Sequence, residues 1–367
     1  MGQHSRLASS RLKVLLLSRY GRLGASSRLR SFQFLPFLTR AGLDVTVSSL
    51  LDDDYVRRLY STRQQNSSAI MVAYIDRLWM LLRARRFDLL WIEKELFPWL
   101  PALAERVLFK LGPPYAVDYD DAIFHNYDLH RLAAVRAALG RKIDVVMRHA
   151  KLVIAGNEYL AVRARASGAR WVELLPTVVD IDRYSRPPAP LQRHDHVIIG
   201  WIGSPSTEHY VGAVVESLRK VCAARGARVV LVGASKAVLP ELAGEVWHWS
   251  EQTESDSIAR FDIGIMPLSD EPWTRGKCGY KLIQYMVCGK PVVASPVGVN
   301  ETLVRHGDNG YLARSADEWT NALQQLCDQP ELRAAMGARG RKLVEEQYSV
   351  QAQGARLMDL LLAAANG

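Results

Sequence analysis

The sequence has few cysteines and no long apolar run. Its four cysteines have neither the spacing of metal ligands nor that of a disulfide framework, which fits a reducing compartment (Cys222, Cys278, Cys288 and Cys327). No stretch approaches the roughly 18 uncharged apolar residues of a membrane-spanning helix. The apolar run Val14 to Leu17 is also too short for a signal-peptide core. We therefore expect a cytoplasmic protein.

The chain of 367 residues is 49% hydrophobic and 23% charged, as expected of a globular protein with about two domains. Its net charge of +9 is unevenly distributed. Residues 1–190 contain 29 Lys and Arg against 18 Asp and Glu, and the remainder contains 18 against 20. Nucleic acid, an anionic membrane or a phosphorylated substrate would each explain a basic first half. The sequence has no zinc-finger spacing or aromatic RNA-binding signature, so we expect no nucleic-acid partner.

Strand-like and helix-like segments alternate in two series separated by the proline-rich segment Arg186–Pro190. The alternation predicts an α/β fold with two doubly wound parallel sheets facing a central cleft. Predicted strands are Lys13–Ser18, Asp44–Ser49, Asp88–Ile92, Tyr115–Asp118, Leu152–Ala155, His196–Trp201, Arg228–Val232, Asp262–Met266 and Pro291–Ala294. Predicted helices include Ser27–Ala41, Tyr210–Ala224 and Tyr280–Val287.

The segment Phe261–Leu312 contains the most informative turn. A strand ending at Pro267 is followed by a polar loop and by a helix that opens near Gly279. The free N–H groups of Gly279, Tyr280 and Lys281, with the helix dipole, would form an anion site. Lys277 and Lys281 add positive charge on the same turn. The pattern suits a diphosphate; the alternative is an ordinary strand–loop–helix crossover with solvated lysines.

The run GKCGYKLIQYMVCGKPVVASPVGVNETLVRHGDNGYLA, residues 276–313, resembles the donor-sugar segment of glycosyltransferase family 4, retaining enzymes of the GT-B fold. The likeness extends over nearly the whole chain. It implies an acceptor-side Rossmann-like domain at 1–186, a donor domain at 187–345, and a C-terminal helix at 346–367 that packs back on the first domain. It also implies a nucleotide-sugar co-substrate, with no metal or other cofactor.

The resemblance implies a set of donor-binding residues and shows two departures from the family pattern. The implied donor-binding residues are Gly203, Ser204, Lys277, Gly279, Tyr280, Lys281, Gln284 and Glu301. Gly276 and Gln284 stand where the family usually has two glutamates, and the segment from Gly203 to His209 lacks the usual Arg and Lys. Gln284 can still bond a ribose hydroxyl, whereas Gly276 cannot replace a carboxylate. We expect Lys277 and Lys281 to supply the missing positive charge.

Candidates in the first half follow predicted strands. Gly21 and Gly24 resemble the family's glycine loop, with Arg28 beside it and with Ser26 or Ser27 as the predicted helix cap. The run Asp118-Tyr119-Asp120-Asp121 places three carboxylates within four residues, which needs a compensating partner.

With Lys281, we expect Asp120 or Asp121 to be catalytic, and His125 is an alternative. A metal-binding Asp-x-Asp motif and aspartates that cap the next helix are other interpretations. Glu93 and Glu95 end another predicted strand on one face.

The stretch Tyr55–Arg86 combines arginines with apolar residues in a helical pattern. Such helices lie on anionic membrane surfaces, although a helix packed on the first domain with a charged rim fits the pattern equally well. The resemblance implies a retaining glycosyltransferase, and with the basic first half and this helix we expect it to be cytoplasmic and peripheral on the inner face of a bacterial cell membrane. Its acceptor would be a sugar or a polyprenyl-linked sugar, for surface polysaccharide or glycolipid. A nucleotide-sugar epimerase and a non-catalytic membrane-associated relative are the alternatives.

Overall fold

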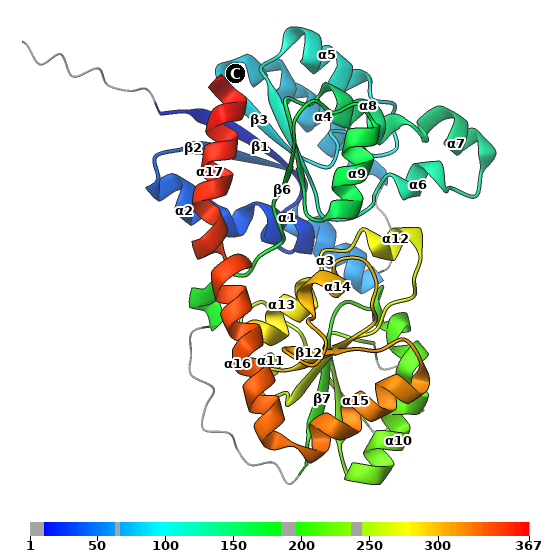
Figure 1. The fold of residues 1–367 in the computed structure, drawn as a ribbon. Coiled ribbons are helices and arrows are strands. Elements are labelled where there is room, and N and C mark those ends of the chain that lie inside the picture. Colours follow the sequence, from blue (N-terminus) through cyan, green and yellow to red (C-terminus); the bar gives the residue numbers. More distant parts are fainter. Residues whose placement is uncertain (1–10, 63–66, 185–195, 236–243, 367) are drawn as a thin grey trace, which may run out of the picture.

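The structure is a computed structural model that describes residues 11–62, 67–184, 196–235 and 244–366. Two α/β domains lie one above the other, and the C-terminal helices run along one side of both (Figure 1). The predicted domain boundary at 186/187 and its proline-rich segment lie outside the described residues.

The first domain is built on a six-stranded parallel sheet in the order β2-β1-β3-β4-β5-β6. Its strands are β1 (Lys13–Tyr20), β2 (Asp44–Leu51), β3 (Leu89–Glu93), β4 (Tyr115–Tyr119), β5 (Leu152–Ala155) and β6 (Val172–Leu174). Its helices are α1 (Ala25–Arg30), η1 (Phe32–Phe34), α2 (Leu35–Arg40), α3 (Asp53–Thr62), α4 (Ser67–Leu82), η2 (Ala84–Arg86), α5 (Leu103–Leu111), α6 (His125–Asp128), α7 (Ala133–Leu139), α8 (Lys142–His149), α9 (Glu158–Ala166) and η3 (Ile181–Tyr184).

The second domain repeats this plan with the order β12-β11-β10-β7-β8-β9, again all parallel. Its strands are β7 (Ile198–Ile202), β8 (Arg228–Val232), β9 (Gly244–Trp247), β10 (Ile263–Met266), β11 (Val292–Ala294) and β12 (Gly310–Leu312). Its helices are η4 (Glu208–Val214), α10 (Val215–Arg225), α11 (Glu254–Ala259), α12 (Pro272–Arg275), α13 (Tyr280–Val287), α14 (Asn300–Leu303), α15 (Ala316–Asp328) and α16 (Pro330–Gln347). Two parallel sheets confirm the predicted fold class.

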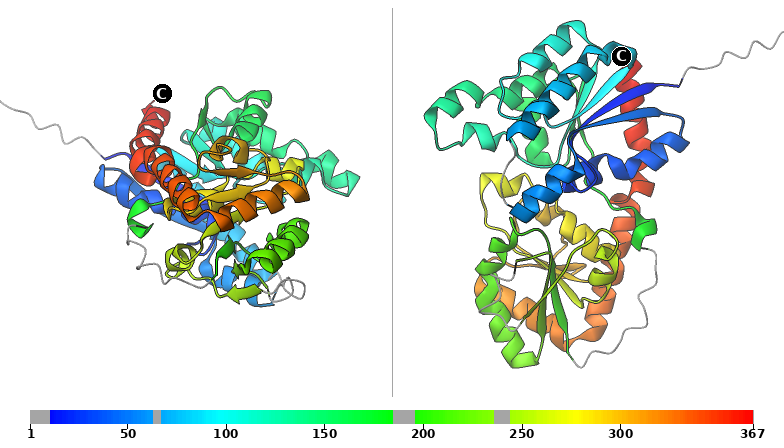
Figure 2. Two further views of the ribbon diagram at one scale, coloured as in Figure 1. Left: turned by 60° about the horizontal axis from the view of Figure 1, so that its bottom comes forward. Right: turned by 180° about the vertical axis from the view of Figure 1, so that it is seen from behind.

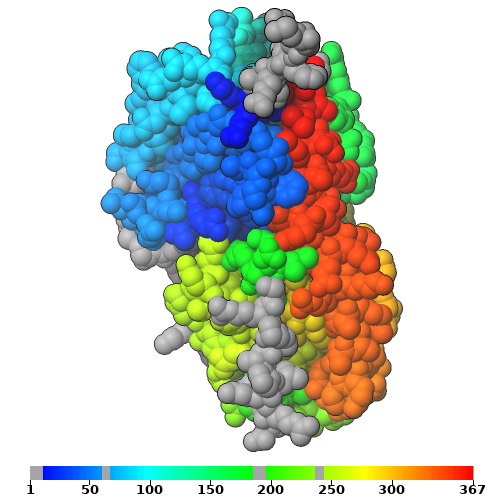
Figure 3. Space-filling view, turned by 90° about the vertical axis from the view of Figure 1, so that its left-hand side faces the viewer, coloured from blue at the N-terminus to red at the C-terminus, as the bar shows by residue number. Residues whose placement is uncertain are grey.

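The last helix, α17 (Val350–Asn366), leaves the second domain and packs on the first. Leu357 and Leu361 are fully buried in one cluster with Val14 and Leu16 of β1. The turn between α16 and α17 is joined to the first domain by a bridge between Val179 and Ser349. Figure 3 shows both helices along one side of the two lobes, and Figure 2 gives the view from behind. The expected return of the C-terminal helix is confirmed.

The helix predicted at Ser27–Ala41 is interrupted. The backbone of Ser31 (φ −129°, ψ −56°) ends α1, and the chain resumes through η1 into α2. Pro36 stands in the first turn of α2, where its missing N–H costs no helical hydrogen bond. The break turns α1 toward the second domain and leaves α2 beneath α17.

Candidate active site

The amino-terminal end of α13 carries unsatisfied donors, as the sequence predicts. Gly279 precedes the helix with φ +65°, and a Cβ there would lie 2.3 Å from Leu303 Cδ1, so only glycine fits without strain. No side chain caps the helix. The N–H groups of Tyr280 and Lys281 donate to no acceptor among the described residues. This end of α13 therefore retains the partial positive charge that attracts anions.

Two lysines add full charges at this helix end. The Lys281 ammonium lies 5.4 Å from the centre of the Trp201 ring, and its Cε lies 2.9 Å from where a Cβ of Gly203 would stand. Burial, together with the nearby charge of Lys277, lowers the pKa of Lys281 to about 8. Among the described residues no carboxylate forms a salt bridge with Lys281, whereas Lys277 Nζ lies 3.7 Å from Asp121 Oδ1. Gly203 therefore lies beside Lys281, in the first turn of the helix that Gly279 precedes.

Each carboxylate of the Asp118–Asp121 run has its own cationic partner. Asp118 is buried and bonded to Arg30 (Nε to Oδ1, 2.9 Å), and burial raises its pKa to about 6. Asp120 Oδ1 lies 2.9 Å from Lys94 Nζ, which is also 4.0 Å from Asp121 Oδ2. Asp121 lies opposite Lys277 of the second domain. The required compensation therefore comes from the protein's own cations, and no side chain of the run caps α6.

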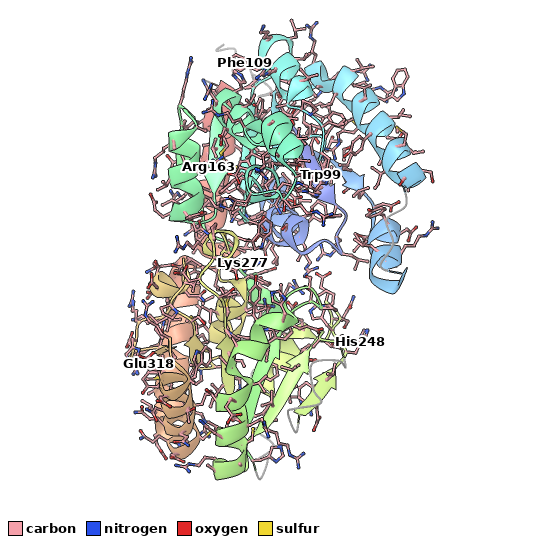
Figure 4. The ribbon with its side chains drawn as sticks, turned by 90° about the vertical axis from the view of Figure 1, so that its right-hand side faces the viewer. Trp99, Phe109, Arg163, His248, Lys277 and Glu318 are labelled. Carbon is pink, nitrogen blue, oxygen red and sulfur yellow. The ribbon has the colours of Figure 1, made fainter. Side chains whose placement is uncertain are left out.

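The loop before α13 is inserted against the first domain. The Asn157 side-chain amide donates to the carbonyls of Gly276 (2.9 Å) and Lys277 (3.0 Å). The Cys278 thiol donates to the Asp120 carbonyl (3.2 Å) and is buried in the first domain's core. A Cβ on Gly276 would stand 2.5 Å from Ala122 Cβ. Gly276, where the family usually has a glutamate, therefore permits close contact between the two domains. Figure 4 labels Lys277 in this region between the domains.

The glycine loop of the first domain, residues 21–24, is fixed by Asp53 of α3. Asp53 of α3 accepts a hydrogen bond from the Leu23 N–H (2.8 Å), and a Cβ on Gly21 would collide with that carboxylate. Gly24, not a serine, is the N-cap of α1. The prediction of a serine cap is thus wrong, because both hydroxyls are engaged elsewhere. Ser26 accepts from Lys94 Nζ (2.8 Å), and Ser27 donates to Glu93 (2.6 Å).

Arg28 connects the glycine loop to the second domain. Its guanidinium is buried and lies 5.2 Å from the centre of the Trp249 ring. Its positive charge also acts on Tyr280, whose pKa is raised by burial. Arg28 thus reaches from the glycine loop of the first domain to Trp249 of the second.

Other predicted residues do not join this group. Gln284 is buried, and its amide donates to the Tyr184 hydroxyl (3.1 Å). Glu301 is exposed and accepts from Arg314 (3.2 Å). Ser204 is bonded within its own loop, to Ser206 (2.8 Å). His125 is engaged by Asp128 and Tyr159, through Nδ1 and Nε2 respectively.

Two residues that the sequence reasoning missed organise the site. Lys94 was passed over in favour of its neighbours Glu93 and Glu95, yet its ammonium pairs with Asp120 and lies 4.0 Å from Asp121. Glu93 and Glu95 are both buried, and Glu95 is 2.5 Å from Lys142 Nζ. Asn157, the N-cap of α9, was not singled out either. The Glu-Lys-Glu run at the end of a buried strand could have indicated that Lys94 is part of the site. Among the described residues no cluster of three or more His, Cys, Asp or Glu is arranged to hold a metal ion.

A family model described as "Glycosyl transferases group 1" matches residues 196–329. Residues of this chain are 30% identical, over 166 positions, to a GDP-mannose-dependent monoacylated alpha-(1-6)-phosphatidylinositol monomannoside mannosyltransferase of Corynebacterium glutamicum. That match spans 41% of this chain and 42% of the relative. N-acetyl-alpha-D-glucosaminyl L-malate synthase of Bacillus anthracis is 39% identical over 72 residues, 19% of each protein. The chain thus matches less than half the length of these relatives.

Solved structures match over nearly the whole chain. Anabaena HepE in complex with UDP has a TM-score of 0.72 at 16% identity, covering 96% of this chain and 100% of that one. WaaG, a glycosyltransferase involved in lipopolysaccharide biosynthesis, has a TM-score of 0.69 at 14% identity, covering 95% and 99%. At these identities the likeness establishes the fold. Residues 196–329 thus match the model of group 1 glycosyl transferases, and the chain as a whole has the GT-B fold.

Proposed function

We propose that the protein transfers a sugar from a nucleoside diphosphate donor to an acceptor, with retention of anomeric configuration and without a metal ion. In this proposal the donor diphosphate binds at the amino-terminal end of α13, between Gly203 and Lys281. The observation that carries it is the half-buried Lys281 ammonium, which has no carboxylate partner among the described residues and lies beside unsatisfied N–H groups.

A diphosphate would satisfy this local excess of positive charge. Lys277 is partly neutralised by Asp121, but Lys281 and the end of α13 are not. When the bond between sugar and diphosphate breaks, negative charge grows on the leaving diphosphate. Fixed donors and ammonium groups aimed at that charge stabilise the transition state more than the ground state. The same lysines therefore account for both binding and leaving-group stabilisation.

The first domain would supply the other wall of the site. The loop of Gly21 and Gly24 and the buried Arg28 lie toward the donor domain, and Asp121 is the proposed catalytic carboxylate nearest the lysines. Asp120, also proposed as catalytic, forms a salt bridge with Lys94. We propose that Asp120 first of all positions the Lys94 ammonium. We propose that Tyr280 and Gln284 contact the nucleoside, Gln284 through its amide oxygen. Ser204 and Glu301 remain donor-binding proposals.

We propose that the acceptor is a sugar, free or polyprenyl-linked, used for bacterial surface polysaccharide or glycolipid. Support comes from the Corynebacterium glutamicum relative, a phosphatidylinositol monomannoside mannosyltransferase, and from the structural neighbour WaaG, which is involved in lipopolysaccharide biosynthesis. The excess of basic residues in the first half of the chain also suits a phosphate-bearing acceptor.

Lys281→Met tests the donor site, because methionine keeps an unbranched side chain one atom shorter than lysine and removes the charge. We expect the affinity for UDP or GDP, measured by calorimetry, to fall about tenfold or more, and transfer to be abolished. Lys220→Met, an exposed lysine of α10, is the matched control and should behave as the wild type. Near-normal turnover of Lys281→Met would refute the proposal.

The same measurements separate the alternative functions. A scaffold would bind no nucleoside diphosphate in a panel of bases. An epimerase would convert a nucleotide sugar in the absence of any acceptor, which product analysis of donor-only reactions would detect. A transferase binds the nucleotide and forms product only when the acceptor is present.

A further inference from the structure

Exposed apolar side chains are concentrated on one part of the first domain. Of sixteen large hydrophobic side chains that are exposed among the described residues, twelve belong to α4, to α5 or to the loop before α5. We call these twelve the apolar face: Met71, Val72, Ile75, Leu78, Trp79, Leu82, Trp99, Leu100, Leu103, Val107, Phe109 and Leu111. None of the sixteen lies in the described part of the second domain. Exposed apolar surface gathered in this way marks an interaction site.

The two helices form one continuous surface. The Tyr74 hydroxyl of α4 donates to the Pro98 carbonyl (2.5 Å), and its ring meets Phe97 edge-on at 5.4 Å. At the far end, Arg85 Nε donates to the Leu111 carbonyl of α5 (3.1 Å). Figure 4 shows the span, with Phe109 at the outer end of the domain and Trp99 closer to the second domain.

The charges around the apolar face are mainly positive. Between residues 67 and 112 the exposed charged residues are Arg83, Arg85, Arg86, Arg106, Lys110, Asp76 and Asp88. Arg77, in the middle of α4, is buried and donates to the carbonyls of Ser18 and Ser48. α4 thus packs on the first domain through Arg77, Tyr74 and Leu81, as one of the two interpretations expects, while its outward side is apolar and the exposed arginines follow its end.

We infer that the apolar face docks on a bilayer surface that contains anionic lipids. This inference rests on the proposed function, because docking would bring the enzyme to a lipid-linked acceptor. Apolar side chains on convex helices flanked by Arg and Lys match the interfacial layer of a membrane, where the former enter the acyl boundary and the latter meet phosphate groups. A second copy of the chain would place its arginines against those of the first.

Hydrogen bonds join the apolar face to the end of the strand that precedes Lys94. Trp99 has φ +62° and its side chain is 51% exposed, and its backbone N–H donates to the Tyr127 hydroxyl (3.1 Å). Tyr127 in turn bonds Glu95, the residue after Lys94. Tryptophan is favoured at the membrane–water interface. Trp99 therefore marks the end of the docking surface from which a lipid-linked acceptor would enter the site.

Co-sedimentation with vesicles tests this inference. The wild-type protein should bind vesicles of equal parts phosphatidylglycerol and phosphatidylcholine at low salt, and bind pure phosphatidylcholine vesicles much less. The double variant Trp79→Ser with Leu82→Ser should lose about tenfold or more in partitioning. Removing Arg83 and Arg86 charges by change to Gln should cost about fivefold for each residue on the anionic vesicles. Val162→Ser, with 55% exposure on α9, is the matched control.

The measurements distinguish a failure of the docking proposal from a failure of the donor-site proposal. UDP affinity without vesicles should be the same in wild type and Trp79→Ser/Leu82→Ser, so a failed docking surface leaves the donor proposal standing. Vesicle binding unchanged in the double variant, or equal on both lipid mixtures, would overturn the inference. So would a wild-type dimer in solution that the double variant turns into a monomer, because the occupant would then be a second copy.

Discussion

The backbone conformation of Lys94 determines the direction in which its side chain points at the end of β3. Its φ of +66° lies in the left-handed region, which side chains other than glycine rarely adopt. Burial opposes its charge, but the carboxylates of Asp120 and Asp121 hold its pKa above the usual range. The turn sends Glu93 and Glu95 into the domain interior and Lys94 toward the cleft-side aspartates.

The depressed pKa of Lys281 predicts a pH dependence of donor binding. In the free protein its ammonium loses the proton as the pH rises through about 8, and the neutral amine attracts a diphosphate less. UDP affinity should therefore be highest below pH 8 and fall by about tenfold per pH unit above it, because binding then requires proton uptake. Lys281→Arg should remove this slope, since arginine stays charged. Calorimetry between pH 7 and pH 9.5 would show it; equal slopes in both proteins would contradict the assignment.

At the scale of elements, the loop 276–278 decides how closely the domains approach. It contributes two carbonyls to Asn157 and a thiol to the Asp120 carbonyl. Asn157 also caps α9 by accepting from the Leu160 N–H (3.0 Å). One amide thus fixes a helix start with its oxygen and holds the donor loop with its nitrogen.

Asn157→Asp separates these two roles. The carboxylate keeps the cap on α9 but cannot donate to the Gly276 and Lys277 carbonyls. We expect an unchanged melting temperature, a larger radius of gyration in solution scattering and a raised KM for the donor. Asn321→Asp, an exposed asparagine of α15, is the control. The same radius of gyration in Asn157→Asp and wild type would show that the two bonds do not hold the domains together.

Gly276→Glu restores the residue that the resembling family usually has at this position, yet we expect it to impair the protein. Its Cβ would meet Ala122 Cβ at 2.5 Å and Ala122 N at 2.7 Å, so the domains would have to separate. Activity should fall instead of rising. Gly212→Glu adds the same side chain at a position with no neighbour within 4 Å of the new Cβ, and should be tolerated. A gain of activity in Gly276→Glu would contradict this account.

At the scale of the whole molecule, the two domains are joined at several points. Arg22 of the glycine loop forms a bidentate pair with Glu251 of the second domain (2.8 and 3.2 Å), and α17 covers the first domain's sheet. The last described helix thus packs in the domain that contains β1. The first domain's stability therefore depends on residues that follow the second domain in sequence.

Leu361→Ala tests this dependence. Leu361 is fully buried, and truncation to alanine leaves a cavity that costs about 2–5 kcal/mol. The transition of the first domain in differential scanning calorimetry should move to lower temperature, while saturating UDP should still raise the transition of the second domain. Asp359→Ala, exposed on the same helix, should change neither transition. Destabilisation of the second domain alone would contradict the packing of α17.

Much of the fold could be predicted because hydrophobic periodicity reports burial locally. The segments Leu152–Ala155, Arg228–Val232 and Tyr280–Val287 begin and end where the sequence predicts. Gly279 was also recognisable, since a helix opening with a glycine and two lysines is a local signal. Partners across domains were not predictable. The contact of Asn157 with Gly276 joins residues 119 positions apart, and no pattern within either segment indicates it.

The sequence by itself determined the two alternating series, their parallel sheets and the charged start of α13, because period, glycine and lysine act over a few neighbouring residues. Only the tertiary structure decided which ionic groups meet. It gave Asp118, Asp120 and Asp121 three different cations, buried Arg77 in α4, and left α4 and α5 apolar on their outward sides. Charge pairing and exposure depend on distances in space, and folding brings residues that are remote in the chain to within a few ångströms.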